Sequence, residues 1–192
     1  LEEKPGTGES LKDTALVVER YVDAVGMRIG GAIPGKDGEP VPGLGDAILR
    51  KYADYTRVPV INLASDLHHP SQAMADVMVM KESLGDLSGK KIVMMWAYSP
   101  LLRAWQSSLS DALISATYGM NVTIVHPEGY DLDTSIMELT QKECAKAGRK
   151  FEILHDPKTA LQGADVVFPR NWWSPRYYMN TKEEELRLAA QH

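Results

Sequence analysis

From residue 89 onward, short apolar runs alternate with amphipathic segments, and no other feature limits the possible folds of the chain so strongly. The apolar runs predict four strands, at residues 91–96, 122–126, 151–154 and 165–169. The segments between them predict helices at residues 105–118, 134–147 and 157–161. Strands that alternate with helices form a parallel, doubly wound sheet, and ligands bind at the carboxyl ends of its strands.

The first third of the chain predicts a further α/β unit. Apolar positions at helical spacing follow Ser10, and two strands are expected at residues 24–29 and 58–63, with a helix at 47–56. Residues 30–46 contain six glycines and three prolines and predict a loop. This loop lacks the Lys-Ser/Thr pair of a P-loop, so a surface or subunit-contact loop is favoured over a phosphate-binding one, and both stay open.

The composition and net charge of the chain argue against several classes of protein. The chain has 192 residues, of which 44% are hydrophobic, and a net charge of -5, which argues against a nucleic-acid or anionic-membrane surface. Its single cysteine, Cys144, excludes an internal disulfide and fits the reducing cytoplasm; we expect it to be structural. No apolar run approaches the roughly 20 residues of a membrane helix. An amphipathic helix is expected over residues 181–192, and both ends of the sequence suggest an internal fragment of a longer protein.

The segment His69-Pro70-Ser71-Gln72-Ala73-Met74-Ala75-Asp76 carries the strongest local signal. Pro70 is expected at the first position of a helix over residues 70–84, which makes His69 its N-cap. The helix field disfavours imidazolium, so a neutral His69 is expected to offer an N–H to a carbonyl oxygen, beside the amide of Gln72. An ordinary capped helix that begins with histidine is the alternative, and His68 is interpreted as a solvated neighbour.

Two arginines are expected at strand ends. Arg28 closes the strand at 24–29, where its guanidinium would grip phosphate and carbonyl oxygens together; a surface ion-pair partner is the alternative. Arg170 follows the strand at 165–169 and is expected to overhang the same cleft, together with Trp172. Core or subunit packing is the alternative for this tryptophan.

The segment from His69 to Asp76 resembles the His-Pro-x-Gln-x-x-x-Asp signature of the aspartate and ornithine carbamoyltransferases. Residues 8–14 and 20–28 are similar to the family's segment before its phosphate-binding arginine. Trp96-Ala97-Tyr98-Ser99-Pro100 and His126-Pro127-Glu128-Gly129-Tyr130-Asp131 are similar to the knotted branch, particularly the YgeW-type enzymes, whose acceptor is unassigned. The resemblance covers nearly the whole chain.

This resemblance implies an architecture. Two doubly wound parallel-sheet lobes, the first incomplete, are expected on either side of a long helix. Residues 1–68 would be the C-terminal part of a carbamoyl-phosphate-binding domain, 69–86 an interdomain helix, and 87–192 a C-terminally truncated acceptor-binding domain. The family's Ser-x-Arg-Thr and His-Cys-Leu-Pro segments would lie outside the chain. The loop after Trp96 corresponds to the threaded loop of knotted relatives, but it keeps only Pro100, so threading stays open.

The resemblance also implies a carbamoyltransferase, an enzyme that moves the carbamoyl group of carbamoyl phosphate to a small amine or ureido-type acceptor. No metal or cofactor is expected. The enzyme is expected to be a cytoplasmic homotrimer that acts in nitrogen metabolism. Two sets of residues follow: Arg28, His69 and Gln72 for carbamoyl phosphate, with Arg28 and His69 catalytic, and Arg170, Trp172, Arg103 and Gln106 for the acceptor. Arg170 falls where ornithine carbamoyltransferases have an aspartate, which argues against ornithine.

Two other functions remain as alternatives. A non-catalytic ligand-binding paralogue would keep the same fold, because a fold alone does not prove activity. A Rossmann-type oxidoreductase is disfavoured, because the turn after Trp96 contains no glycine and would keep a dinucleotide at a distance.

Overall fold

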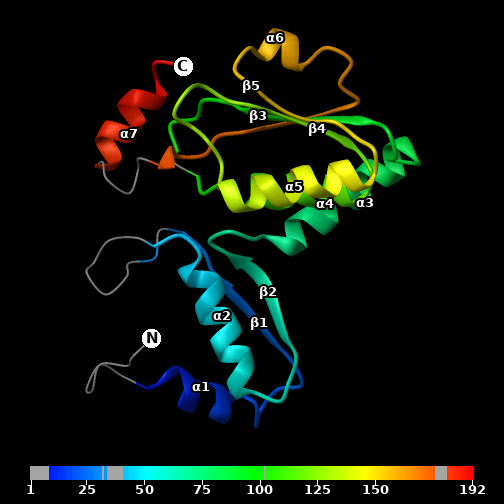
Figure 1. Ribbon diagram of the computed structural model, residues 1–192. Coiled ribbons are helices and arrows are strands. Elements are labelled where there is room, and N and C mark those ends of the chain that lie inside the picture. The colour runs from blue at the N-terminus through cyan, green and yellow to red at the C-terminus, as the bar shows by residue number, and fades with distance from the viewer. Residues whose placement is uncertain (1–8, 32, 34–40, 102, 176–180) are drawn as a thin grey trace.

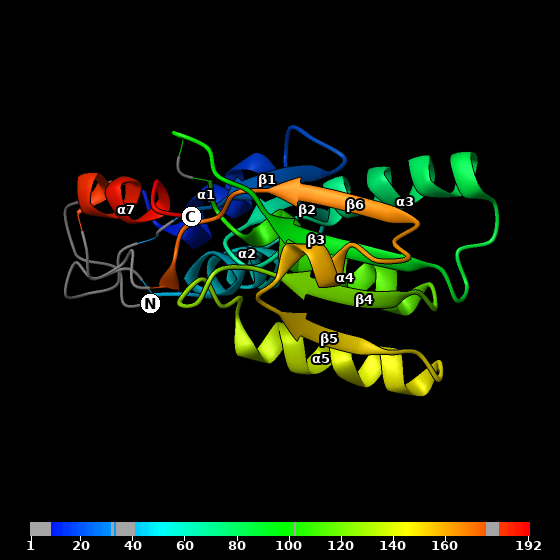
Figure 2. The same cartoon turned by 90° about the horizontal axis from the view of Figure 1, so that it is seen from above.

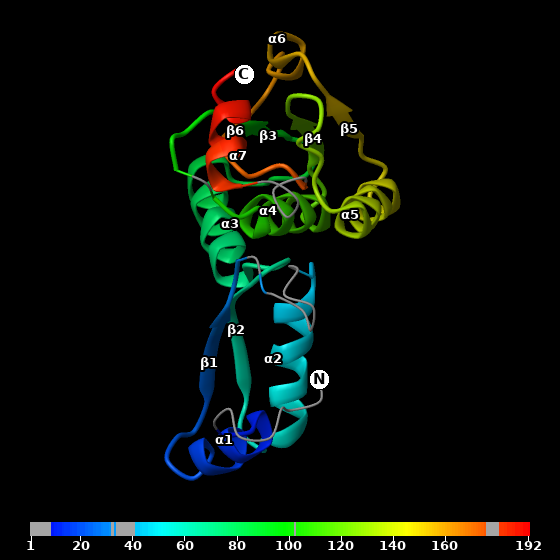
Figure 3. The ribbon, with the colours of Figure 1, turned by 90° about the vertical axis from the view of Figure 1, so that its left-hand side faces the viewer.

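The computed structural model describes residues 9–31, 33, 41–101, 103–175 and 181–192. Within them the chain forms two lobes, with helix α3 (Pro70–Leu84) running from one to the other (Figures 1 and 3). Residues 1–8 and much of the glycine-rich loop, at 32 and 34–40, lie outside these residues.

The first lobe is a small α/β unit. Its elements are α1 (Leu11–Val18), β1 (Val25–Ile29), α2 (Leu44–Tyr55) and β2 (Val60–Ser65). Ser10 caps α1 as expected, because its hydroxyl accepts a hydrogen bond from the backbone N–H of Asp13. β1 and β2 pair in parallel, and their register shifts so that Met27 faces Asn62 whereas Arg28 faces Ala64. The extra residue, Leu63, makes a bulge beside Arg28, a feature that often re-aims a side chain near a functional site.

Helix α2 begins three residues earlier than the sequence predicted. Gly43 is its N-cap in the left-handed region, with φ of 86°, and Gly45 packs so closely on the Ile29 carbonyl that no side chain fits. The carboxylate of Asp66 accepts the N–H groups of Gly43 and Asp46 at 2.6 and 3.2 Å. Gly43 therefore caps the helix and Gly45 allows a close approach, and the loop prediction was wrong for residues 44–46, which belong to α2.

The second lobe confirms the predicted alternation. After α3, which spans the predicted residues, come β3 (Lys91–Trp96), α4 (Gln106–Thr117), β4 (Asn121–Val125), α5 (Thr134–Lys146), β5 (Phe151–Leu154), α6 (Pro157–Ala160), β6 (Val166–Arg170) and α7 (Lys182–Ala189). The four strands are parallel in the order β5-β4-β3-β6 (Figure 2). The order reverses between β3 and β6, and such a switch point is where doubly wound sheets bind ligands.

The core of the second lobe lies between the sheet and helices α4 and α5, while α6 covers the opposite face (Figure 1). Met94, Leu109 and Ile124 are fully buried there. Cys144 is also fully buried, and burial raises the pKa of its thiol, as suits a structural cysteine.

At the end of the described chain, Thr181 caps α7, and Glu185 of this helix accepts the backbone N–H of Ser174 at 2.7 Å. None of the helices in the described part of the chain combines the length and apolar character needed to cross a membrane.

Candidate functional site

Several of the predicted residues lie where the two lobes meet. The backbone N–H of His69, at the start of α3, donates to the hydroxyl of Ser110 on α4 at 2.8 Å. Gly30, directly after β1, lies against the amide nitrogen of Gln106. Arg28 and Arg170, from opposite lobes, both act on the charge of His69. The ends of β1 and β6 and the start of α3 thus form one site.

His69 caps α3 as predicted. Its Nδ1 accepts the backbone N–H of Gln72 at 3.3 Å, so in the neutral ring the proton is on Nε2. Burial, followed by the positive charges of Arg28 and Arg170, lowers the pKa of His69. The residue is therefore neutral at pH 7 with a donor at Nε2. The neutrality was expected from the helix field, whereas burial and the two arginines account for it.

His68 is not the solvated neighbour that the sequence suggested. Its Nδ1 lies 2.8 Å from Oδ1 of Asp46, which also accepts the hydroxyl of Ser65. Burial acts to raise the pKa of Asp46, but the hydrogen bonds of His68 and its neighbours outweigh burial and hold this pKa well below its usual range. Burial raises the pKa of the adjoining Asp66. This network fixes the loop that presents His69.

We expect His68→Ala to lower the free energy of unfolding by about 1–2 kcal/mol, because it removes a charge-assisted hydrogen bond from a half-buried carboxylate. Urea unfolding measures the change. A double-mutant cycle with Asp46→Asn separates the pair from the rest of the network, and additive effects of the two substitutions would contradict the coupling.

The amide of Gln72 is held by Asp76, one turn further along α3. Its nitrogen donates to both carboxylate oxygens of Asp76, at 3.1 and 3.0 Å. With the nitrogen engaged, the amide oxygen is the group that Gln72 can offer to a ligand. The arrangement suits a ligand with N–H donors.

Arg170 ends β6 at the switch point of the sheet, where its carbonyl accepts the N–H of Ala97 after β3 at 3.0 Å. Its guanidinium is half-buried, and its Nε has no hydrogen-bond partner among the described residues. Burial and then the charge of Arg103 lower the pKa of Arg170, while Asp111 and Asp76 act to raise it. Arg103, Arg170 and the two carboxyl groups thus form one electrostatic cluster.

Two predicted acceptor residues are deeply buried. Trp172 is 1% exposed, its indole N–H donates to the Tyr130 carbonyl at 2.8 Å, and its own carbonyl accepts the indole N–H of Trp96. It packs within the core, so its predicted place on the wall of a cleft was wrong. Gln106 is 6% exposed and contacts Gly30 at the junction.

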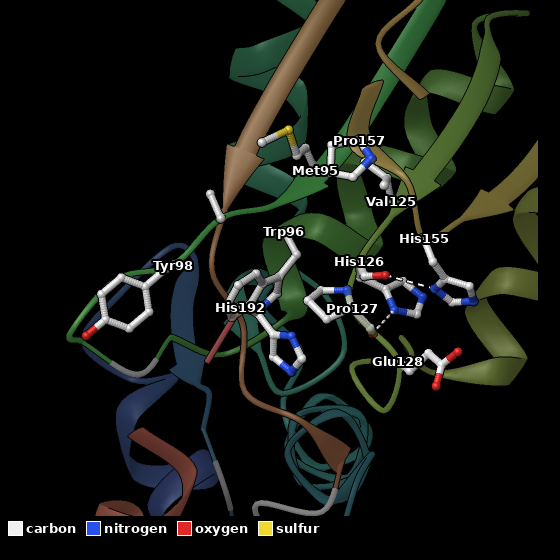
Figure 4. A pocket seen from close by; sticks show the side chains of 11 residues that line it. Met95, Trp96, Tyr98, Val125, His126, Pro127, Glu128, His155, Pro157 and His192 are labelled. Carbon is white, nitrogen blue, oxygen red and sulfur yellow. Dashed lines mark hydrogen bonds between the residues drawn. The ribbon is translucent and has the colours of Figure 1, made fainter. Parts of the chain in front are cut away.

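A cavity of about 580 Å³ that was not predicted from the sequence lies at the carboxyl ends of β3 and β4 (Figure 4). His126 and His155 line it, and both use Nδ1 as a donor, to the carbonyls of Pro127 and His126 at 2.8 and 2.9 Å. Burial lowers the pKa of His126. The strand-end rule, applied to residues 126 and 155, would have found both histidines. In the part of the chain that the structure describes, no three His, Cys, Asp or Glu side chains are grouped to hold a metal ion.

Comparisons with known proteins agree with this architecture. The chain is 34% identical to the N-acetylornithine carbamoyltransferase of Xanthomonas campestris over 97% of its own length and 55% of that protein. It is 33% identical to the putative carbamoyltransferase YgeW of Escherichia coli, over 94% of this chain and 47% of that one. It is 35% identical to the anabolic ornithine carbamoyltransferase of Pyrococcus furiosus, over 87% of this chain and 47% of that one. The chain therefore spans about half the length of these relatives.

Among solved structures, acetylornithine transcarbamylase complexed with acetylcitrulline superposes with a TM-score of 0.85 at 30% identity, over 99% of this chain and 58% of that one. Two family models match consecutive parts of the sequence. The carbamoyl-P binding domain of aspartate/ornithine carbamoyltransferase matches residues 2–82, and the Asp/Orn binding domain of the same enzymes matches residues 88–192. The chain belongs to the aspartate/ornithine carbamoyltransferase family.

Proposed function

We propose that this protein transfers the carbamoyl group of carbamoyl phosphate to a small amine or ureido-type acceptor other than ornithine. The observation that carries the proposal is the gathering of Arg28, His69 and Gln72 at the junction of the lobes, opposite Arg103 and Arg170. These groups offer donors for the phosphate and carbonyl oxygens and an acceptor for the carbamoyl nitrogen.

In the proposed reaction, the acceptor nitrogen attacks the carbonyl carbon, the bond from this carbon to the phosphate oxygen breaks, and the departing phosphate takes the amine proton. Nε2–H of His69 and the guanidinium of Arg28 donate to the carbonyl oxygen, which gains negative charge in the transition state. The amide oxygen of Gln72 accepts from the carbamoyl nitrogen. Holding both reactants in one orientation supplies several kcal/mol more.

In this proposal each lobe binds a different substrate. We assign residues 1–68 to carbamoyl phosphate, 69–86 to the connecting helix, and 87–192 to the acceptor. The homotrimer, the cytoplasmic location and the threaded loop that the resemblance implies remain predictions. Light scattering on the purified protein tests the first, and cell fractionation tests the second.

The charge at the junction supports an anionic acceptor. Burial, followed by the charge of Asp76, raises the pKa of Asp111 to about 8, so Asp111 is mostly neutral at pH 7. Arg28, Arg103 and Arg170 supply the positive charges at the junction, and Asp76 acts on Arg170 and His69. The resulting positive excess favours a carboxylate and disfavours an ammonium group. Relatives named for ornithine and for N-acetylornithine match at 35% and 34% identity, so similarity does not choose between the two acceptors.

The full-length protein therefore should carbamoylate N-acetylornithine with a kcat/KM at least about tenfold above that for ornithine, since one repelled charge in a site is worth roughly 1.4 kcal/mol or more. The two acceptors differ at the α-nitrogen, which is charged only in ornithine. Phosphate release and the mass of the carbamoylated product measure the rates. Equal or better turnover of ornithine would contradict the proposed acceptor class.

The same assay separates an enzyme from a non-catalytic paralogue. A protein that binds carbamoyl phosphate in calorimetry but releases no phosphate with any amine or ureido compound of a broad panel would be a binding protein. Phosphate release that depends on the acceptor would establish the transferase.

A further inference from the structure

A buried carboxyl group beside the proposed site has no assigned role. Asp111, on α4, is 1% exposed, and neither of its carboxyl oxygens has a hydrogen-bond partner among the residues that the structure describes. It lines a cavity of about 170 Å³ together with Asp76 of α3. The remaining walls of this cavity are apolar and include Met80, Ile92 and Phe168.

Two carboxyl groups in apolar surroundings do not both ionise readily, because their negative charges repel each other and the apolar walls do not stabilise them. One proton shared by the pair removes most of the cost. The pKa of Asp111, raised to about 8 by burial and then by Asp76, agrees with this arrangement. Asp76 accepts the two hydrogen bonds from the amide nitrogen of Gln72.

Among the described residues, Arg170 is the cation that interacts electrostatically with both carboxyl groups. Its Nε is buried without a hydrogen-bond partner among the described residues, as are both carboxyl oxygens of Asp111. The two side chains act on each other, since Arg170 lowers the pKa of Asp111 and Asp111 raises that of Arg170. Phe168 and Arg170 are alternate residues of β6, so both face the side of the sheet that carries the cavity.

We propose that Asp76 and Asp111 form a proton-sharing carboxyl pair whose charge sets how strongly the charge of Arg170 acts on the acceptor. The part that concerns the acceptor rests on the proposed function. Asp111 is a positioning residue, because it acts through Arg170. Asp76 also accepts hydrogen bonds from Gln72. The carboxyl pair therefore connects Gln72, assigned to carbamoyl phosphate, with Arg170, assigned to the acceptor.

The pair makes acceptor binding depend on pH in a definite direction. The charged and titratable groups around it are Arg28 on β1, His69 on α3, Arg103 after β3 and Arg170 on β6. With the proton present, the arginines are in excess and attract a carboxylate. When the proton leaves, one more negative charge faces Arg170, and the affinity for an anionic acceptor falls. A single linked proton lowers affinity up to about tenfold between pH 7 and 9 for a group that titrates near 8.

The first test compares the wild type with Asp111→Asn, which keeps the size of the side chain but cannot ionise. With N-acetylornithine as the probe, the KM ratio of wild type to variant should rise by about tenfold from pH 7 to 9. The ratio cancels the titration of the acceptor's own amine. Ser115→Ala removes a buried hydroxyl of α4 that has no hydrogen-bond partner among the described residues, and it should keep the wild-type profile. A ratio for Asp111→Asn that does not change with pH would overturn the proposal.

The second test needs no turnover. Carbon-13 NMR of labelled aspartate carboxyls should show one group in the wild-type protein that titrates near pH 8. This titration should disappear in Asp111→Asn and move to lower pH in Asp76→Asn, which removes the neighbouring negative charge. If the pair titrates in this way but no acceptor is carbamoylated, the proposed function fails and the pair stands. If no aspartate titrates above pH 6, the pair itself is refuted.

Discussion

We expect His69→Asn to lower kcat by about a hundredfold while the protein unfolds at the wild-type temperature. The side-chain oxygen of asparagine can accept the N–H of Gln72, as Nδ1 of His69 does at 3.3 Å, so the helix keeps its cap. The shorter side chain cannot place a donor where Nε2–H lies. Losing one donor to a developing oxyanion typically costs about a hundred- to a thousandfold in kcat. Steady-state phosphate release and thermal unfolding measure the two effects.

His69→Ala provides the contrast, because alanine removes the donor and the cap together. It should lose activity to the same extent and also about 1 kcal/mol of stability. Acid should likewise lower the stability of the wild type. As the pH falls through the lowered pKa of His69, Nδ1 takes up a proton and can no longer accept the N–H of Gln72. Wild-type turnover in His69→Asn would mean that the histidine is a cap and nothing more.

Periodic signals predicted the elements of the fold well. Helix α3 spans the predicted residues because both of its ends carry local signals, Pro70 at the first position and Gly85 with φ of 73° at the C-cap. Strands β3 and β5 were also predicted with their observed bounds, since each is a short apolar run between polar turns. The parallel order followed from the alternation of strands and helices.

Errors arose where a distant residue decides the local structure. The start of α2 depends on the carboxylate of Asp66, which lies 20 residues beyond Asp46 in sequence, and no local pattern reveals that contact. The same holds for His68, whose partner Asp46 precedes it by 22 residues. Trp172 was predicted to line a cleft because it follows a strand end. Its indole N–H instead donates to the carbonyl of Tyr130 within the core.

The candidate site shows a similar limit. Arg28, His69 and Gln72 belong to short motifs, so the sequence could nominate them. Asp111 has no motif, and its environment depends on a different helix and on β6. Only the packing of α3 and α4 against the sheet makes this carboxyl group unusual, and sequence periodicity predicts burial without predicting which polar group is buried.

Arg28→Gln should weaken the binding of carbamoyl phosphate by about ten- to a hundredfold. Hydrogen bonds to charged groups contribute about 1.5–3 kcal/mol, and glutamine keeps a polar but shorter side chain without the charge or the forked donors. The bulge between β1 and β2 lies beside Arg28, at the end of the strand nearest His69. Calorimetry with carbamoyl phosphate alone measures the affinity before any acceptor is present.

The loss of affinity in Arg28→Gln should arise because Arg28 lies in the site, and not because the protein carries one positive charge fewer. Arg50→Gln, on the exposed side of α2, removes the same charge from the same lobe and should leave the affinity within about twofold, because salt screens exposed charges at a distance. Arg28→Lys should fall between the two, since lysine keeps the charge and loses the fork that grips two oxygens. If Arg28→Gln and Arg50→Gln bind equally well, Arg28 takes no part in binding, and the phosphate must be held by other groups.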